Sequence, residues 1–242
     1  MSEKILVTGG LSGIGGAITR KLIETGHFVV FTHRKNCDSI EDILSAYGTD
    51  CCLPVYCDIQ DGRIDDKARQ IIAEQEGLSA LVNNIGVSSE AIVYQTEPDA
   101  FWRTVTTNIG AAYEFSRLVW PLFLKRRGGK IINISSAAVE NVRIGNGIYA
   151  ASKAFVDRMA DSMALEGARF GICVNTIAPG FTLTPMLNAA FEDADKRRAV
   201  QSQIPTRKFQ TPDDIAATVL WLIQFDVFLT GARLPVAGGG HL

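Results

Sequence analysis

Short apolar runs alternate along the chain with longer segments in which apolar residues recur every three or four positions. The apolar runs are rich in Val, Ile and Leu, as buried strands are, and the longer segments have the period of helices. We expect strands at residues 4–8, 27–32, 51–57, 78–82, 130–135, 171–177 and 232–237. Helices are expected at residues 13–25, 38–47, 63–76, 98–124, 149–167 and 212–224, with a further helical stretch at 181–205.

Strands that alternate with helices throughout predict an α/β fold, in which a doubly wound parallel sheet of about seven strands has helices on both faces. The sequence has no internal repeat, no low-complexity segment and no linker, so we expect a single domain over residues 1–242. The stretch at 181–205 mixes apolar and charged residues and is expected to be a helical insertion that closes over substrate.

Composition and charge exclude several classes of protein. The 242 residues are 47% hydrophobic with a net charge of −2, and charges of both signs are interspersed, which argues against a nucleic-acid-binding surface. No apolar run approaches the roughly 20 residues that span a bilayer. The five cysteines form no C-x-x-C pair and no zinc-like spacing, so we expect reduced thiols, no metal site and a cytoplasmic location. The first strand begins almost at once, which leaves no room for a signal peptide.

A glycine-rich turn joins the first expected strand to the first expected helix. Gly9, Gly13 and Gly15 follow the pattern G-x-x-x-G-x-G. A turn in this position directs backbone N–H groups and a helix dipole at a phosphate, although glycines also serve ordinary tight turns. Because this turn lies directly between a strand and a helix, we favour a nucleotide cofactor.

The second expected strand ends in a basic sequence, His33-Arg34-Lys35. In a dinucleotide-binding fold this strand end meets the adenosine ribose, where an acidic residue binds the 2′-hydroxyl of NAD. Here a guanidinium is available to pair with a phosphate, which favours NADP(H) over NAD(H). The alternative is a solvent-facing basic loop.

Three side chains suited to proton transfer follow the strand expected at 130–135. Tyr149 and Lys153 are four residues apart, so a helix would place them on one face, and Ser136 would lie at the carboxyl end of the strand. A free phenol has a pKa of about 10, and a nearby ammonium lowers that pKa. Ser136 would then hold a substrate oxygen by a hydrogen bond. The alternative is that Tyr149 and Lys153 are two amphipathic residues on a helix surface.

Taken in order, the motifs of this chain resemble those of the short-chain dehydrogenase/reductase family over essentially its whole length. The resemblance rests on three motifs and three further positions: Thr8-Gly9-x-x-x-Gly13-x-Gly15, Asn83-Asn84-Ile85-Gly86 and Tyr149-x-x-x-Lys153, with Asn108, Ser136 and Pro179-Gly180 in the family's order. It implies a Rossmann-type fold and an NAD(P)-dependent oxidoreductase acting on CH–OH or C=O groups.

The resemblance also implies roles for individual residues. Tyr149 is expected to be the acid–base residue, Lys153 to lower its pKa and hold the nicotinamide ribose, and Ser136 to orient the substrate carbonyl. Asn108 is expected to support a water-mediated proton relay through Lys153. The expected cofactor contacts are Gly9, Ser12, Gly13, Ile14, Gly15, His33, Arg34, Lys35, Asp58, Ile59, Asn84, Gly86, Tyr149, Lys153, Pro179, Gly180, Thr182 and Thr184. The resemblance implies no metal.

Three positions depart from the family pattern. Ser12 stands where many NADP-dependent members carry arginine, so the cofactor preference rests on Arg34 and its neighbours. Ile85 replaces the usual alanine of the second motif. Ala237 stands where an Asp or Asn often precedes the last glycines, so the packing of the C-terminus, and with it assembly, could differ.

Within the family, the compact length and the pattern Thr230-Gly231-x-x-Leu234-x-Val236 are most similar to 3-oxoacyl-[acyl-carrier-protein] reductases and acetoacetyl-CoA reductases. The hypothesis is therefore an NADPH-dependent ketoreductase that reduces a β-keto thioester in fatty acid or polyketide biosynthesis. The alternatives are an alcohol, sugar or steroid dehydrogenase of the same family and a non-catalytic cofactor-binding sensor or partner subunit.

The resemblance also raises the question of partners. We expect a homo-oligomer, a tetramer or a dimer, with assembly with a paralogue as the alternative, and neither nucleic acid nor a membrane as a partner. Apolar surface for assembly is expected from Phe101, Trp102, Val105, Phe115 and Leu118. Four cations, Arg126, Arg127, Arg143 and Arg207, could meet an acidic acyl carrier protein, although scattered surface cations are the more ordinary explanation.

Overall fold

A parallel sheet of seven strands forms the middle layer of the molecule, in the order β3-β2-β1-β6-β7-β8-β9. The computed structural model describes residues 2–34, 38–88, 91–185, 194–224 and 229–242. The seven strands are β1 (Lys4–Val7), β2 (Phe28–His33), β3 (Cys52–Tyr56), β6 (Leu78–Asn83), β7 (Gly129–Ile134), β8 (Ile172–Pro179) and β9 (Arg233–Val236). They confirm the strands expected from the sequence, and with them the doubly wound α/β fold in a single domain.

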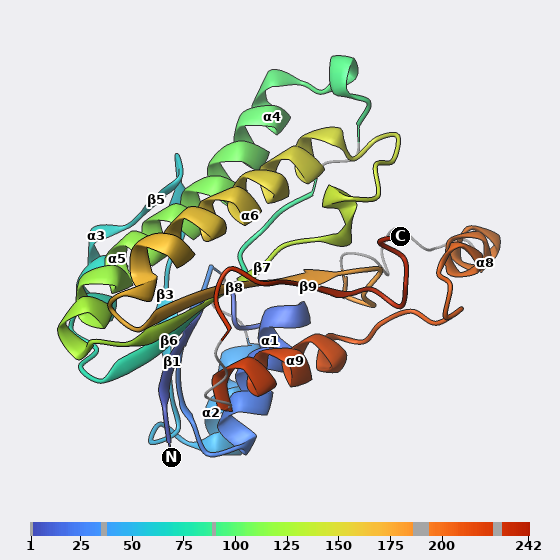
Figure 1. The fold of residues 1–242 in the computed structure, drawn as a ribbon. Helices are drawn as coiled ribbons and strands as arrows, with labels where there is room; N and C mark the ends of the chain where they lie inside the picture. Colours follow the sequence, from blue (N-terminus) through green and yellow to red (C-terminus); the bar gives the residue numbers. More distant parts are fainter. Residues whose placement is uncertain (1, 35–37, 89–90, 186–193, 225–228) are drawn as a thin grey trace.

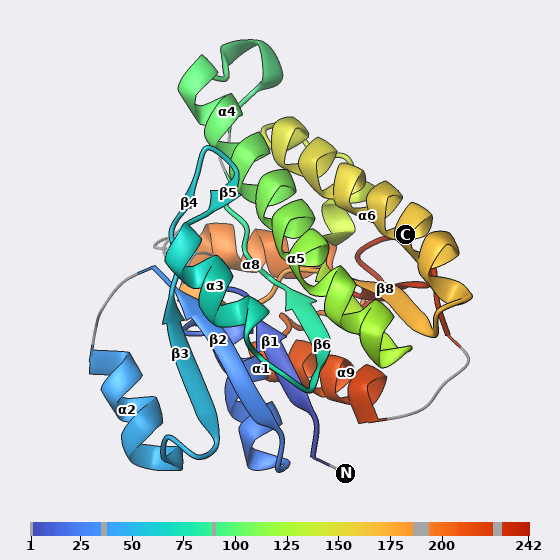
Figure 2. The same ribbon diagram turned by 90° about the vertical axis from the view of Figure 1, so that its left-hand side faces the viewer.

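Helices cover both faces of the sheet, as Figures 1 and 2 show from two directions. One face carries α1 (Gly13–Glu24), α2 (Asp38–Tyr47) and α9 (Pro212–Gln224), and the other carries α3 (Asp66–Ala73), α5 (Ala111–Arg126) and α6 (Gly147–Ala168). The side chains of β1 alternate between these layers, because Ile5 and Val7 belong to the first core and Leu6 to the second. Burial on both faces explains why the strands are continuous apolar runs.

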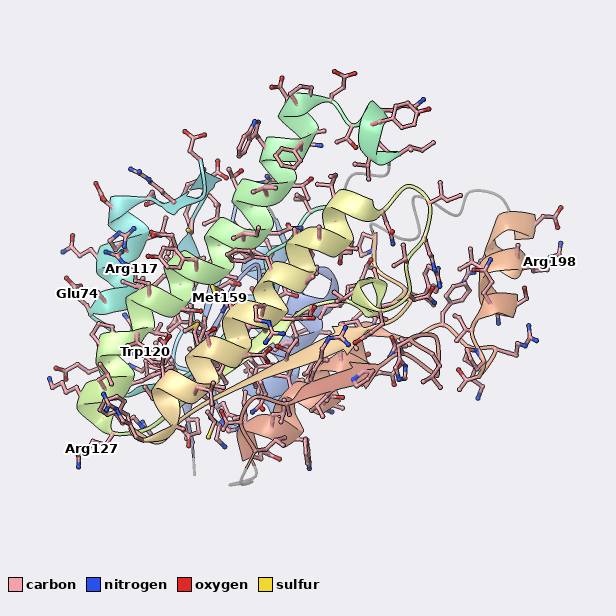
Figure 3. The ribbon with its side chains drawn as sticks, turned by 45° about the horizontal axis from the view of Figure 1, so that its top comes forward. Glu74, Arg117, Trp120, Arg127, Met159 and Arg198 are labelled. Carbon is pink, nitrogen blue, oxygen red and sulfur yellow. The ribbon has the colours of Figure 1, made fainter. Side chains whose placement is uncertain are left out.

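Two helices extend beyond these layers. The helix α4 (Pro98–Val105) rises above the sheet, and α8 (Ala194–Gln203) stands apart at the end where the chain terminates. Figure 3 shows Arg198 on α8 at the edge of the molecule, far from Arg127 at the end of α5. The helix α8 lies within the stretch expected as a helical insertion, whose residues 186–193 lie outside the described part of the chain.

The prediction of a helix at 63–76 was partly wrong, because the first two residues of this stretch form a strand. Residues Arg63–Ile64 form β5, which pairs in antiparallel fashion with β4 (Ile59–Gln60). The turn between them is Asp61-Gly62, whose φ values of 50° and 76° are both positive, as a two-residue hairpin turn requires. The helix α3 begins only after Asp65, whose carboxylate accepts a hydrogen bond from Ala68 N at 2.9 Å.

The long helix expected at 98–124 is interrupted by a π-helical turn at Thr106–Gly110, labelled η2, between α4 and α5. The hairpin turn of β4 and β5 presses against this π turn. A Cβ on Gly110 would lie 2.5 Å from Gly62 Cα, so the two backbones approach as closely as only glycines permit. The hairpin and the π turn are therefore in direct main-chain contact.

One residue expected on an assembly surface belongs to the core instead. Phe115 of α5 is 0% exposed and packs in the core between the sheet and α3, α5 and α6. Trp102 on α4, by contrast, is 60% exposed, as expected for a surface residue. Four of the five cysteines lie in the described part of the chain, and no disulfide joins any two of these four.

Replacing Phe115 with Ala should lower the free energy of unfolding by about 3–5 kcal/mol, because a large side chain leaves a cavity in a closed core. Chemical denaturation followed by circular dichroism measures this change. The matched control is Tyr113→Ala on the same helix, where the side chain is 51% exposed. A change of less than about 1 kcal/mol should result there. Equal effects of the two substitutions would contradict the assignment of Phe115 to the core.

Candidate active site

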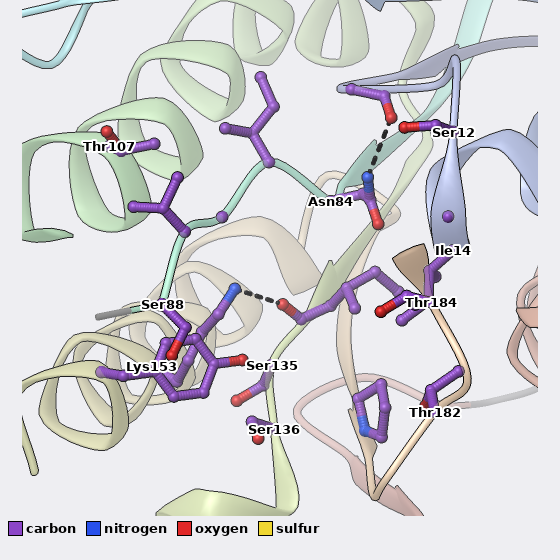
Figure 4. A pocket seen from close by; sticks show the side chains of 18 of the residues that line it. Ser12, Ile14, Asn84, Ser88, Thr107, Ser135, Ser136, Lys153, Thr182 and Thr184 are labelled. Atoms are coloured by element: carbon purple, nitrogen blue, oxygen red, sulfur yellow. Dashed lines mark hydrogen bonds between the residues drawn. The ribbon is translucent and has the colours of Figure 1, made fainter. Parts of the chain in front are cut away.

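A cavity of about 880 Å³ runs along the carboxyl ends of the parallel strands. Its walls include the ends of β1, β2, β6, β7 and β8, and the order of the strands reverses between β1 and β6. Ligands of doubly wound sheets bind at such a reversal, because the connections from the two adjacent strands leave toward opposite faces. Figure 4 shows the side chains that converge on this cavity.

Most of the residues expected to form the site line this cavity: Gly9, Ser12, Gly13, Ile14, His33, Arg34, Asp58, Ile59, Asn84, Gly86, Ser136, Tyr149, Lys153, Pro179, Gly180, Thr182 and Thr184. Gly15 and Asn108 are buried behind the wall, and neither lines the cavity. Lys35 lies outside the described residues.

The glycine turn after β1 has the geometry of a phosphate cradle. Gly9 and Gly13 have φ values of 64° and 56°, which favour glycine. A Cβ on Gly15 would lie 2.2 Å from the carbonyl oxygen of Gly9, so no side chain fits at the start of α1. The turn therefore leaves its backbone open to the cavity at the N-terminus of a helix.

Hydrogen bonds from two neighbouring strands hold this turn in place. Asn84 Nδ2 donates to the carbonyl oxygens of Thr8 at 3.0 Å and Gly9 at 3.2 Å, and the Asn84 backbone N donates to Thr8 Oγ1 at 2.9 Å. On the other side, Gly9 N donates to Thr32 Oγ1 at 2.9 Å. Thr8 and Thr32 were not among the predicted site residues. Their signal was a hydroxyl at the end of an otherwise apolar strand.

The basic residues after β2 differ in their surroundings. His33 is 7% exposed, and its ring lies 5.9 Å from the ring of Tyr56 in an edge-on contact. Arg34 is exposed and lines the cavity together with Asp58. Among the described residues, the Arg34 guanidinium is therefore the cation at this end of the cavity, while His33 forms part of the wall.

Ser136, Tyr149 and Lys153 converge at the other end of the cavity. Ser136 follows β7 and caps the short helix η3 (Ala137–Val139), with its Oγ accepting a hydrogen bond from Ala138 N at 3.1 Å. The Tyr149 side chain is hydrogen-bonded with that of Ser136. Lys153 Nζ lies 6.0 Å from the centroid of the Tyr149 ring and donates to the carbonyl oxygen of Ile134 at 2.9 Å.

Burial controls the acid–base properties of these groups. It lowers the pKa of Lys153 to about 8, against the opposing charge of Asp157. It also raises the pKa of Tyr149, and the hydrogen bond with Ser136 opposes that rise. The sequence led us to expect that Lys153 lowers the Tyr149 pKa. The net direction of the Tyr149 pKa is upward because burial outweighs the contact from Ser136, and the effect of Lys153 on this pKa stays a prediction.

Asn108 lies in the π turn and acts within the protein rather than in the cavity. It is 1% exposed, and its Oδ1 accepts from Val87 N at 2.7 Å. Its Nδ2 donates to the carbonyl oxygen of Val87 at 3.0 Å and to Ser152 Oγ at 2.9 Å. The side chain thus joins the segment after β6 to α6, one residue before Lys153. An asparagine within a helical pattern was the sequence signal, and Ser152 was not predicted.

Glycines also allow two close approaches near the reacting groups. A Cβ on Gly86 would lie 3.0 Å from Lys153 Nζ, so only glycine leaves the ammonium its full space. A Cβ on Gly180 would lie 2.9 Å from Ala237 Cα. Ala237 is 5% exposed, so the small residue found at this departure from the family pattern packs directly behind the loop after β8.

Several residues that line the open end of the cavity were not predicted individually: Ala138, Asn141, Arg143, Asn146, Phe181 and Gly240. The Arg143 guanidinium lies 4.3 Å from the centroid of the Phe181 ring, and Phe181 makes an edge-on contact with Phe209. Asn141 Nδ2 donates to the carbonyl oxygen of Gly240 at 2.8 Å. These residues lie in loops, where neither periodicity nor a motif marks them.

No three His, Cys, Asp and Glu side chains of the described residues cluster in a way that could hold a metal ion. Within the same residues, no helix is both long enough and apolar enough to cross a bilayer.

Comparison with known proteins extends these observations to the whole chain. The model of the short chain dehydrogenase family matches residues 3–195. An acetoacetyl-CoA reductase from Acinetobacter sp. (strain RA3849) is 33% identical, and the match covers 100% of both chains. The 3-oxoacyl-[acyl-carrier-protein] reductase FabG from Vibrio harveyi is also 33% identical, over 98% of this chain and 96% of its own.

Solved structures show the same likeness. A structure described as ElxO with NADP bound has a TM-score of 0.89 at 26% identity, covering 99% of each chain. A single-residue variant of the actinorhodin polyketide ketoreductase with NADPH also has a TM-score of 0.89 at 26% identity, covering 99% of this chain and 97% of its own. The cavity, the ordered motifs and these matches together show that this chain belongs to the short-chain dehydrogenase/reductase family of NAD(P)-dependent oxidoreductases.

Proposed function

We propose that this protein is an NADPH-dependent ketoreductase that reduces the 3-keto group of a β-keto thioester, carried by coenzyme A or by acyl carrier protein. The observation that carries the proposal is that one cavity joins a phosphate cradle to a hydrogen-bonded tyrosine–serine pair beside a buried lysine. The two relatives named above, matched over nearly their full lengths, are named for reductions of this kind.

The residues present fit a nicotinamide dinucleotide. The open glycine turn would hold the pyrophosphate, Arg34 and Asp58 the adenosine end, and Lys153 the nicotinamide ribose. A Cβ on Gly13 would lie 3.7 Å from Thr184 Cγ2, so the turn and the loop after β8 face each other across the cavity. When bound, the cofactor supplies the hydride that reduces the carbonyl carbon.

The protein's own groups handle the oxygen and its proton. Ser136 Oγ accepts from Ala138 N and is hydrogen-bonded with the Tyr149 side chain, and its O–H would donate to the substrate carbonyl when substrate binds. Tyr149 gives its proton to that oxygen as negative charge develops there. The Lys153 ammonium stabilises the phenolate that Tyr149 becomes. Asn108 supports this group by holding Ser152 and, through Val87, the segment that faces Lys153.

The same groups serve both directions, because the residue that donates a proton in reduction accepts one in alcohol oxidation. Reduction is proposed because the two relatives reported above are named as reductases.

Arg34 supports NADP(H) as the cofactor. Its exposed guanidinium lines the adenosine end of the cavity and is suited to a 2′-phosphate. Two of the structural neighbours contain NADP or NADPH. With Ser12 in place of the arginine common in NADP-dependent members, Arg34 would carry most of the preference.

Among the arginines expected to face a carrier, Arg143 is the strongest candidate. It lines the open end of the cavity, whereas Arg126 pairs with Glu3 and Arg207 donates to the carbonyl oxygen of Ser202. Arg127 lies at the far end of the molecule from α8. We assign Arg143 to the phosphate-bearing arm of the thioester carrier.

We also propose a lid, a homotetramer and a cytoplasmic location. Arg197 of α8 lies 5.7 Å from the Phe209 ring, and Phe209 contacts Phe181 at the cavity mouth, which supports closure by the 181–205 stretch. Large apolar side chains on α4 and α6 support assembly: Trp102, Phe155 and Leu165 are 60%, 50% and 83% exposed. A reducing compartment is in keeping with described cysteines that form no disulfide with one another.

Tyr149→Phe should lower kcat for acetoacetyl-CoA reduction by about 10²–10⁴-fold and leave the Kd for NADPH within about threefold, because only the proton donor is lost. Oxidation of NADPH followed at 340 nm and NADPH fluorescence titration measure the two quantities. Turnover retained in this variant would refute the mechanism. Wild-type enzyme that binds NADPH but reduces no β-keto thioester would refute the substrate class alone.

The rate of reduction should be constant through neutral pH and fall as the pH rises above about 8, where Lys153 loses its proton. A neutral lysine no longer stabilises the phenolate, so proton donation becomes more costly. The measurement is kcat/KM for NADPH-dependent reduction between pH 6 and 10. A rate that increases across pH 8–9 would show that deprotonation of the site assists reduction, contrary to this assignment.

Arg34→Ala should raise the KM for NADPH by about 10-fold or more, because a charge-assisted hydrogen bond to a phosphate is lost, and should leave the KM for NADH within about twofold. Steady-state kinetics with the two cofactors side by side test this. The control is Arg103→Ala on α4, an exposed arginine that does not line the cavity. Equal changes for NADPH and NADH would exclude a role for Arg34 at the 2′-phosphate.

A further inference from the structure

A half-buried arginine on the edge strand β9 contacts the active site from behind. Arg233 Nη2 donates to the carbonyl oxygen of Ser136 at 2.9 Å, and its Nε donates to Asp157 Oδ2 at 2.8 Å. Its Nη1 pairs with the Glu140 carboxylate. All three guanidinium nitrogens are therefore used, and they join β9 to α6 and to both ends of the short helix that Ser136 caps.

The partner of this arginine on α6 lies next to the catalytic lysine. Asp157 is one helical turn beyond Lys153, so the two side chains are neighbours on the helix surface. The Asp157 side chain is 14% exposed and that of Arg233 22% exposed. The charged groups that face Asp157 are Lys153 and Asp161 from α6 and Arg233 from β9, and Glu140 faces it through Arg233.

Stability alone does not account for this pair. Withdrawing two charges from water costs free energy that their attraction barely returns, and apolar side chains of similar size often serve as well. The pair does, by contrast, reach two residues of the active site. Arg233 donates to the backbone of Ser136, and Asp157 lies beside Lys153.

We propose that Arg233 and Asp157 are positioning residues of the active site: Arg233 fixes the main chain of Ser136, and Asp157 maintains the positive charge of Lys153. Ser136 Oγ accepts from Ala138 N, so the carbonyl contact from Arg233 and this contact together fix both the backbone and the side chain of the residue. Asp157 opposes the burial that lowers the pKa of Lys153.

The first test removes the negative charge beside Lys153 with Asp157→Asn. Loss of a neighbouring anion makes an ammonium easier to deprotonate, so the pH above which reduction slows should move down by about one unit. The pH above which NADPH affinity weakens should move with it, because the ribose contact needs the ammonium. Fluorescence titration of NADPH across pH 6–10 records this second change without any substrate, so the test is independent of the proposed thioester.

The second test separates positioning from folding. Arg233→Lys keeps a cation, but one ammonium cannot reproduce the planar fork, and kcat should fall about 10-fold with the Kd for NADPH within about twofold. The double variant Arg233→Met/Asp157→Leu leaves no charge of the pair unpaired and is therefore expected to fold. It should show both the loss of kcat and the shifted pH dependence. The control is Arg158→Met on α6, where the side chain is 83% exposed and pairs with Asp161.

Two results would overturn the proposal. The first is a pH dependence of NADPH binding in Asp157→Asn that coincides with that of the wild type. The second is a folded double variant whose kcat lies within twofold of the Arg158→Met control. Either result would leave the pair as a structural contact between β9 and α6, whichever carbonyl substrate the enzyme reduces.

Discussion

The distance between the carboxyl ends of β1 and β6 is the constraint on which the rest of this structure depends. The strand order reverses there, so the chain leaves the two strands toward opposite faces of the sheet and a crevice opens between them. The Asn84 side chain bridges that crevice by donating to the carbonyl oxygens of Thr8 and Gly9. These hydrogen bonds set the spacing between the two strand ends. The positions of the phosphate cradle, the cavity wall and Lys153 depend on that spacing.

A buried ammonium is the second demand on the fold. Lys153 is 4% exposed, and a charge so placed is tolerated only where polar groups and an anion compensate for the lost water. The carbonyl oxygen of Ile134 at the end of β7 accepts from it, and Asp157 lies one turn away on α6. The hydrogen bond from Lys153 to Ile134 thus holds α6 against the sheet, and Asp157 helps to keep Lys153 charged.

The sequence predicted the layers and the ordered motifs because both are local patterns: apolar runs, helical periods, glycine spacing and a tyrosine four residues before a lysine. It did not predict the β4–β5 hairpin, since Ile64 of β5 shares a helical period with Ala68 and Ile72 of α3. It assigned Phe115 to a surface because periodicity marks an apolar face without saying what covers it. The Arg233 contacts join residues 76 and 97 positions apart, and no local pattern records such a separation.

The contact between Gly62 and Gly110 sets a rule for recombining this chain with its relatives. Gly62 meets Thr106 and Gly110 main chain to main chain, with no side chain at either glycine to absorb a difference in backbone position. A chimera with the segment around Gly62 from one parent and the segment around Gly110 from the other would combine two backbones whose positions are not matched to each other. The mismatch would fall at the π turn that contains Asn108. Crossover points in a shuffled library therefore belong outside the interval from β4 to the start of α5, so that both glycines come from the same parent.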